Sequence, residues 1–165
     1  MKTLENKTAA ELIEKIKSKT AKIGVIGLGY VGLPLAVEKA KAGYSVTGFD
    51  IQQKKVEMVN SGINYIGDVL DGDLKDVVES GKLRASSNYD EIGELDAVAI
   101  CVPTPIDKYK QPDLTYVENT TKEIAERLHK GMLVVLESTT YPGTTEEVLK
   151  PILESTGLKC GEDFF

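Results

Sequence analysis

Short apolar runs alternate with stretches of helical periodicity along most of the chain. Five runs of four to eight mainly apolar residues have the length of strands, and they occupy residues 22–26, 45–49, 82–85, 95–102 and 132–136. Between them, apolar residues recur at spacings of three and four, which indicates amphipathic helices. Strands that alternate with helices predict an α/β domain, in which a parallel sheet is covered by helices on both faces.

The predicted helices begin at recognisable signals. Thr8–Glu11 and Thr115–Glu118 have the spacing of capping boxes, so helices capped by Thr8 and Thr115 are predicted. The other helices are predicted directly after Gly32, over residues 52–60 and 73–80, and from Gly143 towards Leu153.

One junction carries a chemical signal. The strand at residues 22–26 runs into Gly27-Leu-Gly29-Tyr-Val-Gly32, and a helix follows at once. In this pattern Gly27 allows a tight turn, Gly29 leaves room for a pyrophosphate, and Gly32 lets the helix lie close to the sheet. Asp50 ends the next strand, where a carboxylate can accept the ribose hydroxyls of NAD and would repel the 2′-phosphate of NADP. The pattern predicts an NAD site; the alternative is a glycine turn without a ligand.

This motif specifies the fold class further, as a doubly wound parallel sheet of the Rossmann type. We predict a leading helix within residues 1–20 and one dinucleotide-binding domain over residues 21–165. The full fold has six strands, and a sixth apolar strand could begin at Asp163–Phe165. We therefore expect a fragment of a longer enzyme, truncated at or near that strand.

Composition narrows the partners and the compartment. The net charge of −6 disfavours binding to nucleic acid or to an anionic membrane. No apolar stretch has the length of a membrane span, and the N-terminus has no signal-peptide core. Two cysteines, Cys101 and Cys160, form no disulfide framework, and with one histidine, His129, no metal site is expected. A reducing, cytoplasmic location follows.

Two further polar clusters follow the later strands, at Cys101–Pro105 and Glu137–Thr145. The carboxyl ends of the strands form the ligand side of an open α/β sheet, so both clusters are expected to face the same crevice as the glycine loop.

These segments resemble a known family. Gly27–Ala36, Val102-Pro-Thr-Pro105 and Glu137-Ser-Thr139 with Pro142-Gly-Thr-Thr145 are similar to the NAD-binding N-terminal domain of the UDP-glucose/GDP-mannose dehydrogenase family. Cys101–Pro105 together with Asp107–Leu114 is most similar to the UDP-N-acetylhexosamine 6-dehydrogenases. The resemblance implies oxidation of the C6 alcohol of a UDP-sugar to a carboxylate, with two NAD used in turn, by an enzyme that is a homo-oligomer at full length.

The resemblance also implies roles for individual residues. Gly27, Tyr30 and Val31 would line the pyrophosphate, Asp50 would bind the adenosine ribose, and Lys55 would lie in its neighbourhood. Thr104 would lie near the nicotinamide ribose and Ser138 beside the nicotinamide, and Thr139 would help to hold a catalytic water. The cofactor-binding residues also include Gly29, Gly32, Val102, Pro103 and Thr139. The alternatives are that Thr104 only shapes a turn, that Ser138 and Thr139 only cap the strand end, and that Lys55 belongs to a solvated helix face.

The nucleophile of the family is a cysteine on a separate domain. Cys101 and Cys160 have no nearby base in a recognisable motif, so both are interpreted as structural and the chain alone is expected to bind NAD without oxidising a sugar. Two other functions stay open: an NAD-dependent domain of the 3-hydroxyacid or 6-phosphogluconate dehydrogenase type, and a stand-alone NAD-binding module.

Overall fold

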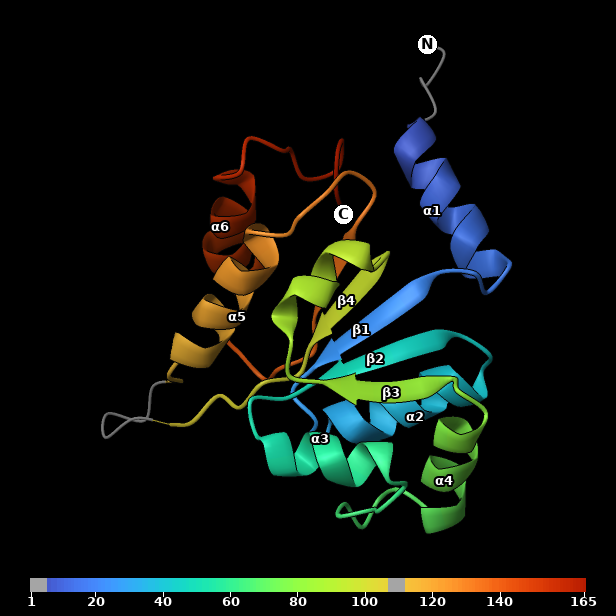
Figure 1. Cartoon of the computed structure of the whole chain (residues 1–165). Helices are drawn as coiled ribbons and strands as arrows, with labels where there is room; N and C mark the ends of the chain where they lie inside the picture. Colours follow the sequence, from blue (N-terminus) through green and yellow to red (C-terminus); the bar gives the residue numbers. More distant parts are fainter. Residues whose placement is uncertain (1–5, 107–111) are drawn as a thin grey trace.

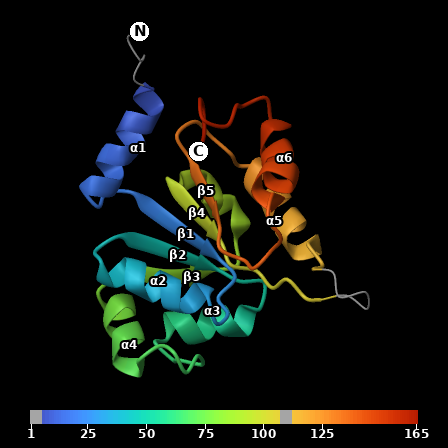
Figure 2. The same ribbon diagram turned by 180° about the vertical axis from the view of Figure 1, so that it is seen from behind.

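The computed structural model describes residues 6–106 and 112–165, and it contains a parallel sheet of five strands. The strands are β1 (Lys22–Ile26), β2 (Ser45–Phe49), β3 (Leu83–Ser86), β4 (Ala97–Ile100) and β5 (Leu133–Leu136). Their spatial order is β3-β2-β1-β4-β5, and all four neighbouring pairs are parallel (Figures 1 and 2). The predicted doubly wound fold is confirmed.

Helices cover the two faces of this sheet. They are α1 (Lys7–Lys17), α2 (Gly32–Lys41), α3 (Gln53–Asn60), α4 (Asp71–Glu79), α5 (Thr115–Ala125) and α6 (Lys150–Glu154), with a 3₁₀ helix η1 (Tyr89–Glu94) and a π-helical turn η2 (Thr145–Leu149). Helices α2, α3 and α4 group with β1 to β3, and α5 and α6 lie together at the other side of the sheet (Figures 1 and 2).

Alternate residues of the central strands pack into two separate cores. Val25 and Ala99 belong to the core under α2 and α4, whereas Ile26, Val98 and Ile100 belong to the core under α5 and α6. Side chains on a strand alternate between its faces, so each of these strands is buried on both sides. This explains why the sequence shows nearly continuous apolar runs.

Both capping predictions are wrong by a few residues. Asn6 caps α1, since its Oδ1 accepts the backbone N–H of Ala9 at 3.2 Å, and Thr8 lies inside the first turn. At α5, the carboxylate of Asp113 accepts the N–H of Thr115 at 2.9 Å and its hydroxyl at 2.6 Å. In both cases an Asx side chain just before the helix, and not the threonine, satisfies the free donors.

Helix α2 ends at a glycine cap. Gly43 has φ +103°, its N–H donates to Ala40, and the N–H of Tyr44 donates to Lys39. This is the Schellman arrangement, which places a glycine in the left-handed region directly after the helix.

The last predicted helix differs in its start. Gly143 has φ +96° and belongs to the preceding turn, and the helical residues begin with the π turn of η2. Pro151, near the start of α6, cannot donate to the helix ladder and would clash with the carbonyl four residues earlier. The wider π turn accommodates this proline.

The final residues lie beside β5. The N–H of Phe165 donates to Met132 at 3.0 Å, the N–H of Val134 donates to Phe165 at 2.7 Å, and Phe164 is buried. This segment occupies the place at which a sixth strand was predicted to begin.

Helix α1 is fastened to the body of the domain. Tyr44 Oη donates to the carbonyl of Ile16 at 2.9 Å, and Lys15 Nζ lies 2.6 Å from Asp96 Oδ1. None of the helices in the described part of the chain is long and apolar enough to cross a membrane.

Candidate functional site

Four strands end in one row across the sheet. Phe49 pairs with Ile26, Ile26 with Ile100, and Ile100 with Leu136. The residues that follow this row are therefore neighbours, although they are far apart in sequence. They are Asp50, Gly27, Cys101 and Glu137, and the N–H groups of the last three continue the ladder at 2.8–2.9 Å. The row brings the glycine loop and both polar clusters to one edge.

The three motif glycines have different reasons to be glycine. Gly27 has φ +96°, and a Cβ atom there would lie 2.6 Å from the carbonyl oxygen of Cys101. At Gly32 a Cβ would lie 1.7 Å from the oxygen of Gly27. A Cβ on Gly29 would meet nothing within 4 Å. Gly27 and Gly32 are thus required by the turn itself, and Gly29 borders open space at the start of α2, where unpaired N–H groups can receive an anion.

The role predicted for Gly32 needs a correction of detail. The nearest obstacle to a side chain is the carbonyl of Gly27 in the same turn, and the Cβ of Cys101 comes only third, at 3.2 Å. The main role of Gly32 is therefore to let the turn close, and its role in the approach of the helix to the strand is secondary.

Asp50 is a buried carboxylate that the protein already contacts. It is 5% exposed. Its Oδ2 accepts the N–H of Leu28 at 3.0 Å and contacts Lys55 Nζ at 3.3 Å, and its Oδ1 accepts the N–H of Gln52 at 2.9 Å. Because an ionised carboxylate offers about four acceptor positions, the described residues leave one position on Oδ1 open, and of the three donors named here only the Lys55 side chain could swing away.

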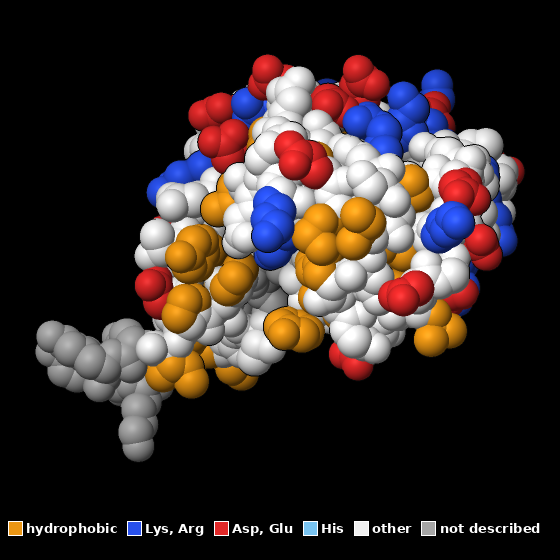
Figure 3. All heavy atoms as spheres, turned by 60° about the horizontal axis from the view of Figure 1, so that its bottom comes forward, with side chains coloured by type: hydrophobic (Ala, Val, Ile, Leu, Met, Phe, Trp, Pro, Cys, Tyr) orange, Lys and Arg blue, Asp and Glu red, His pale blue; other side chains and the backbone are white. Residues whose placement is uncertain are grey.

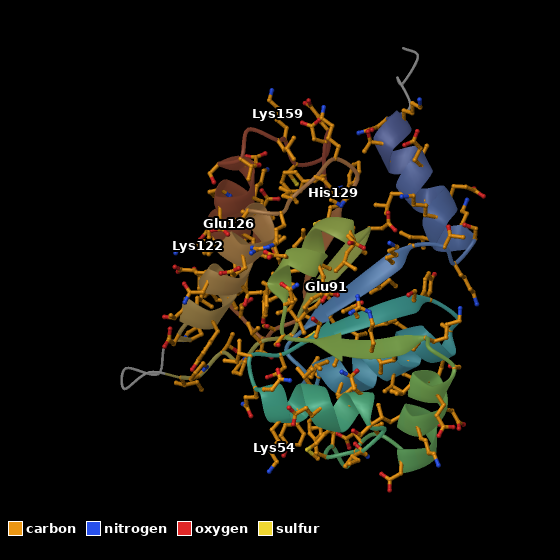
Figure 4. All side chains as sticks on the ribbon, in the orientation of Figure 1. Lys54, Glu91, Lys122, Glu126, His129 and Lys159 are labelled. Atoms are coloured by element: carbon orange, nitrogen blue, oxygen red, sulfur yellow. The ribbon has the colours of Figure 1, made fainter. Side chains whose placement is uncertain are left out.

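Lys55 and its neighbour Lys54 point in different directions. The side chain of Lys55 is 27% exposed and reaches Asp50, whereas Lys54 is exposed and points away from the sheet on α3 (Figure 4). The alternative of a solvated helix face describes Lys54 and not Lys55.

A cleft of about 530 Å³ lies over the row. Its lining includes eleven of the twelve predicted site residues, all but Gly32: Gly27, Gly29, Tyr30, Val31, Asp50, Lys55, Val102, Pro103, Thr104, Ser138 and Thr139. The structure thus brings the three sequence segments together in a single cavity of the size of small-molecule sites.

Four lining residues were not among the predicted site residues: Tyr65, Ile66, Cys101 and Glu137. Tyr65 and Ile66 come from the connection between α3 and α4, which the sequence predicted only as a loop. The several apolar residues of this connection are a signal that it packs against something, and Ile66 and Val69 are indeed buried.

The hydroxyl groups near one end of the cleft already donate to the protein. Thr104 Oγ1 donates to the carbonyl of Thr139 at 2.8 Å, and Ser138 Oγ donates to the carbonyl of Val102 at 2.8 Å. These bonds tie the turn after β4 to the turn after β5, as the structural alternatives propose. The hydroxyl oxygens keep their acceptor positions, so the same residues can also receive an amide or hydroxyl donor.

A smaller groove of about 190 Å³ shares Gly27, Asp50 and Lys55 with this cleft and extends from them towards Tyr89 and Tyr116. Ile51, Tyr89, Tyr116 and Thr120 form its outer walls. Burial, with the negative charges of Asp50 and Glu123 adding to it, raises the pKa of Tyr89 to about 12. This neutral aromatic lining suits a flat heterocyclic ring.

Exposed hydrophobic side chains border these cavities. Tyr30 and Val31 line the larger cleft, Ile51 and Tyr116 line the smaller groove, and all four side chains are exposed. On the face drawn in Figure 3, hydrophobic side chains gather at the left and the centre, and charged side chains crowd the upper margin. A patch of this kind around a cleft indicates a surface that binds something. The motif segment 107–111 lies outside the described residues.

The cysteines and the histidine do not form a nucleophilic site. Burial raises the pKa of the Cys101 thiol to about 12, and Glu137 adds to the shift, so the thiol is protonated at neutral pH. Cys160 is exposed near the C-terminal segment. Both ring nitrogens of His129 lie within 3.0 Å of backbone carbonyl oxygens, those of Leu95 and Lys130, between β4 and α1 (Figure 4).

Comparison with known proteins places these features in a family context. Residues 21–164 match the model of the UDP-glucose/GDP-mannose dehydrogenase family, NAD binding domain. The chain is 43% identical over 148 residues to UDP-N-acetyl-D-glucosamine 6-dehydrogenase of Pseudomonas aeruginosa, which covers 89% of this chain and 34% of that protein. It is 39% identical over 145 residues to UDP-N-acetyl-D-mannosamine dehydrogenase of Pyrococcus horikoshii, a match that covers 87% of this chain and 34% of that protein.

A solved structure agrees with these similarities. The NDP-N-acetyl-D-galactosaminuronic acid dehydrogenase of Methanosarcina mazei superposes with a TM-score of 0.82 at 40% identity, over 93% of this chain and 35% of that one. The chain spans about a third of the length of the relatives it matches.

Proposed function

This chain belongs to the UDP-glucose/GDP-mannose dehydrogenase family as its NAD-binding domain, and from this premise we propose that it supplies the cofactor half of the active site of a UDP-sugar 6-dehydrogenase. The observation that carries the proposal is the cleft that joins the glycine loop, Asp50 and the two hydroxyl-bearing turns over one row of strand ends. Residues 21–165 would form the cofactor-binding unit and residues 1–20 its leading helix, a division that the matched range 21–164 supports.

In this proposal NAD lies along the cleft. The pyrophosphate would sit above Gly29, Tyr30 and Val31, where the amino end of α2 favours negative charge. The open acceptor position of Asp50, and the position that Lys55 could vacate, would receive the ribose hydroxyls. The groove beyond Asp50 would hold the adenine.

The other end of the cleft would hold the reacting part of the cofactor. Thr104 and Ser138 would accept hydrogen bonds from the nicotinamide amide or ribose, and Thr139 would help to hold a water molecule for the hydrolytic step. When bound, NAD would accept a hydride from the sugar carbon. The named relatives support a UDP-N-acetylhexosamine or UDP-glucose as the substrate, oxidised at C6 to a carboxylate with two NAD.

We propose that this chain alone binds NAD without oxidising a sugar. The protonated, buried Cys101 supports this, because a thiohemiacetal needs a thiolate. The unpaired Cys101 and Cys160 support a reducing, cytoplasmic location. A homo-oligomeric full-length enzyme belongs to the same proposal.

The test is calorimetric titration of the chain with NAD and NADP. Wild-type protein should bind NAD more tightly than NADP, and Asp50→Asn should weaken NAD binding by about 1–3 kcal/mol, since charged hydrogen bonds are lost. In the same variant the difference in affinity between NAD and NADP should become smaller. The negative charge that repels the 2′-phosphate is gone, while the positive charge of Lys55 stays.

Asp96→Asn is the matched control. Asp96 also accepts a backbone N–H, that of Lys22 at 2.8 Å, and pairs with a lysine, but it lies at the opposite end of the sheet. It should lower stability without changing NAD affinity. Absence of NAD binding by the wild type, or equal losses in the two variants, would refute the proposed site.

A further inference from the structure

Leu28, inside the glycine loop, is held at three points. Its side chain is fully buried, and the space beneath it exists because residue 48 is glycine: a Cβ there would lie 2.6 Å from Leu28 Cδ2. Its N–H donates to Asp50 Oδ2 at 3.0 Å. Its carbonyl accepts the phenolic hydroxyl of Tyr65 at 2.8 Å. The last contact is long-range, since Tyr65 belongs to a different loop, 37 residues further along the chain.

The loop that carries Tyr65 is firmly anchored. Ile66 and Val69 are buried in the core under α2 and α4. Asn64 Nδ2 donates to the carbonyl of Val69 at 2.6 Å, and Asn64 Oδ1 accepts the N–H of Ile66 at 2.9 Å. Tyr65 is thereby presented to the cleft from a rigid support, and both it and Ile66 line the cavity.

The phenol is suited to act as a permanent donor. Burial, together with the negative charge of Asp50, raises the pKa of Tyr65 well above its ordinary value. The hydroxyl therefore keeps its proton throughout the physiological pH range, and the carbonyl of Leu28 is its acceptor.

We propose that Tyr65 is a positioning residue for the pyrophosphate of the dinucleotide, acting through the peptide group that joins Leu28 to Gly29; this inference rests on the proposed NAD-binding function. The carbonyl of Leu28 and the N–H of Gly29 belong to one rigid plane. Fixing the carbonyl fixes the orientation of that N–H, and Gly29 itself lines the cleft. Donation to the carbonyl also polarises the peptide and strengthens the N–H as a donor.

Asp50 and Tyr65 then act on the same residue from its two sides. Asp50 restrains the peptide before Leu28, and Tyr65 restrains the peptide after it. The carboxylate proposed for the ribose and the loop proposed for the phosphates are thus mechanically linked, with the loop between α3 and α4 as the outer support.

The test uses Tyr65→Phe, which removes one oxygen and keeps the ring in the core. Affinities for NAD, ADP-ribose and adenosine are measured by calorimetry, or by NMR titration where binding is weak. Loss of one positioning hydrogen bond is expected to lower the affinity for NAD and for ADP-ribose about three- to tenfold. Adenosine, which has no phosphate, should bind within about twofold of wild type.

Tyr44→Phe is the matched control. Tyr44 is also half-buried and donates to a backbone carbonyl, that of Ile16, at 2.9 Å, but at the opposite end of the domain. Both variants should lose comparable stability, and only Tyr65→Phe should lose phosphate-dependent affinity. In ¹H–¹⁵N spectra without ligand, Tyr65→Phe should shift the Gly29 amide and Tyr44→Phe should leave it in place.

Wild-type NAD affinity in Tyr65→Phe overturns the positioning role and leaves the proposed function intact. An equal loss for adenosine, or an equal loss of NAD affinity in Tyr44→Phe, also overturns it, since either would reveal a general structural effect. Failure of the wild-type chain to bind NAD refutes the proposed function, and the role of Tyr65 with it. An unchanged Gly29 amide in Tyr65→Phe contradicts the transmission through Leu28.

Discussion

Gly29 and Gly32 lie in one turn, and alanine at each position is expected to have opposite consequences. A Cβ on Gly29 meets no atom within 4 Å, and its backbone lies outside the left-handed region. Gly29→Ala should therefore keep or slightly raise the free energy of unfolding, by up to about 1 kcal/mol, because alanine restricts the unfolded chain. It should weaken NAD binding at least about tenfold, since the methyl group occupies space that the pyrophosphate would need.

Gly32→Ala should instead damage the fold. Its Cβ would lie 1.7 Å from the oxygen and 2.9 Å from the carbon of the Gly27 carbonyl, both backbone atoms that cannot rotate away. The turn must open, at a cost of at least about 3 kcal/mol, the upper range for overpacked sites. In a domain of this size that corresponds to a fall in the melting temperature of roughly 6–12 °C.

Urea unfolding followed by circular dichroism and NAD titration by calorimetry separate the two effects. Gly29→Ala is predicted to change binding without loss of stability, and Gly32→Ala to change stability first. Wild-type affinity in Gly29→Ala would show that no phosphate approaches that backbone. Wild-type stability in Gly32→Ala would show that the turn has room to spare, and the geometric reasoning would then be wrong.

Two further predictions concern titratable groups. The hydroxyl of Ser86, followed by Arg84, lowers the pKa of Glu91, so this carboxylate stabilises the fold above its ordinary pKa and the stabilisation is lost as the pH falls through the lowered value. Glu91→Gln should reduce the free energy of unfolding by about 1 kcal/mol at pH 7, and a deficit that persists in acid would contradict this origin. With the pKa of Cys101 raised to about 12, only about one thiol in ten thousand is ionised at pH 8, so a thiol reagent should modify Cys160 quickly and Cys101 only on denaturation. Cys160→Ser should abolish the fast phase, and a fast phase that survives would place the reactive thiol at Cys101.

The sequence predicted the elements of this fold better than their ends. The central strands β1 and β4 were predicted because burial on both faces leaves a nearly continuous apolar run, a local property of the chain. Thr8 and Thr115 were wrongly predicted as caps because Asn6 and Asp113 lie just before them and also have acceptor side chains. The choice between two such acceptors depends on how the incoming chain is tethered: Asn6 also donates to the carbonyl of Glu162, far away in sequence.

Part of the candidate site could be predicted from the sequence, and part of it could not. The glycine loop and Asp50 could be predicted from spacing, because both are consequences of one strand–turn–helix–strand unit. Tyr65 could not be, since its role depends on where a loop between two helices folds back. A structural use of Thr104 and Ser138 could be predicted as an alternative, but their acceptors could not, because the carbonyls of Thr139 and Val102 belong to the opposite turn.

What brings the separate motifs together is core packing rather than the motifs themselves. In β4, Val98 and Ile100 pack into the core under α5 and α6, whereas Ala99, and Cys101 directly after the strand, face the core under α2 and α4. A slip of one residue would send every one of these side chains to the wrong face, and it would also set Val102 beside Gly27 in place of Cys101. Burial on both faces therefore excludes the slip, and the same constraint positions the carboxyl ends of the strands. The geometry of the cleft is thus stabilised in large part by core residues such as Val98, Ala99 and Ile100, which do not line it.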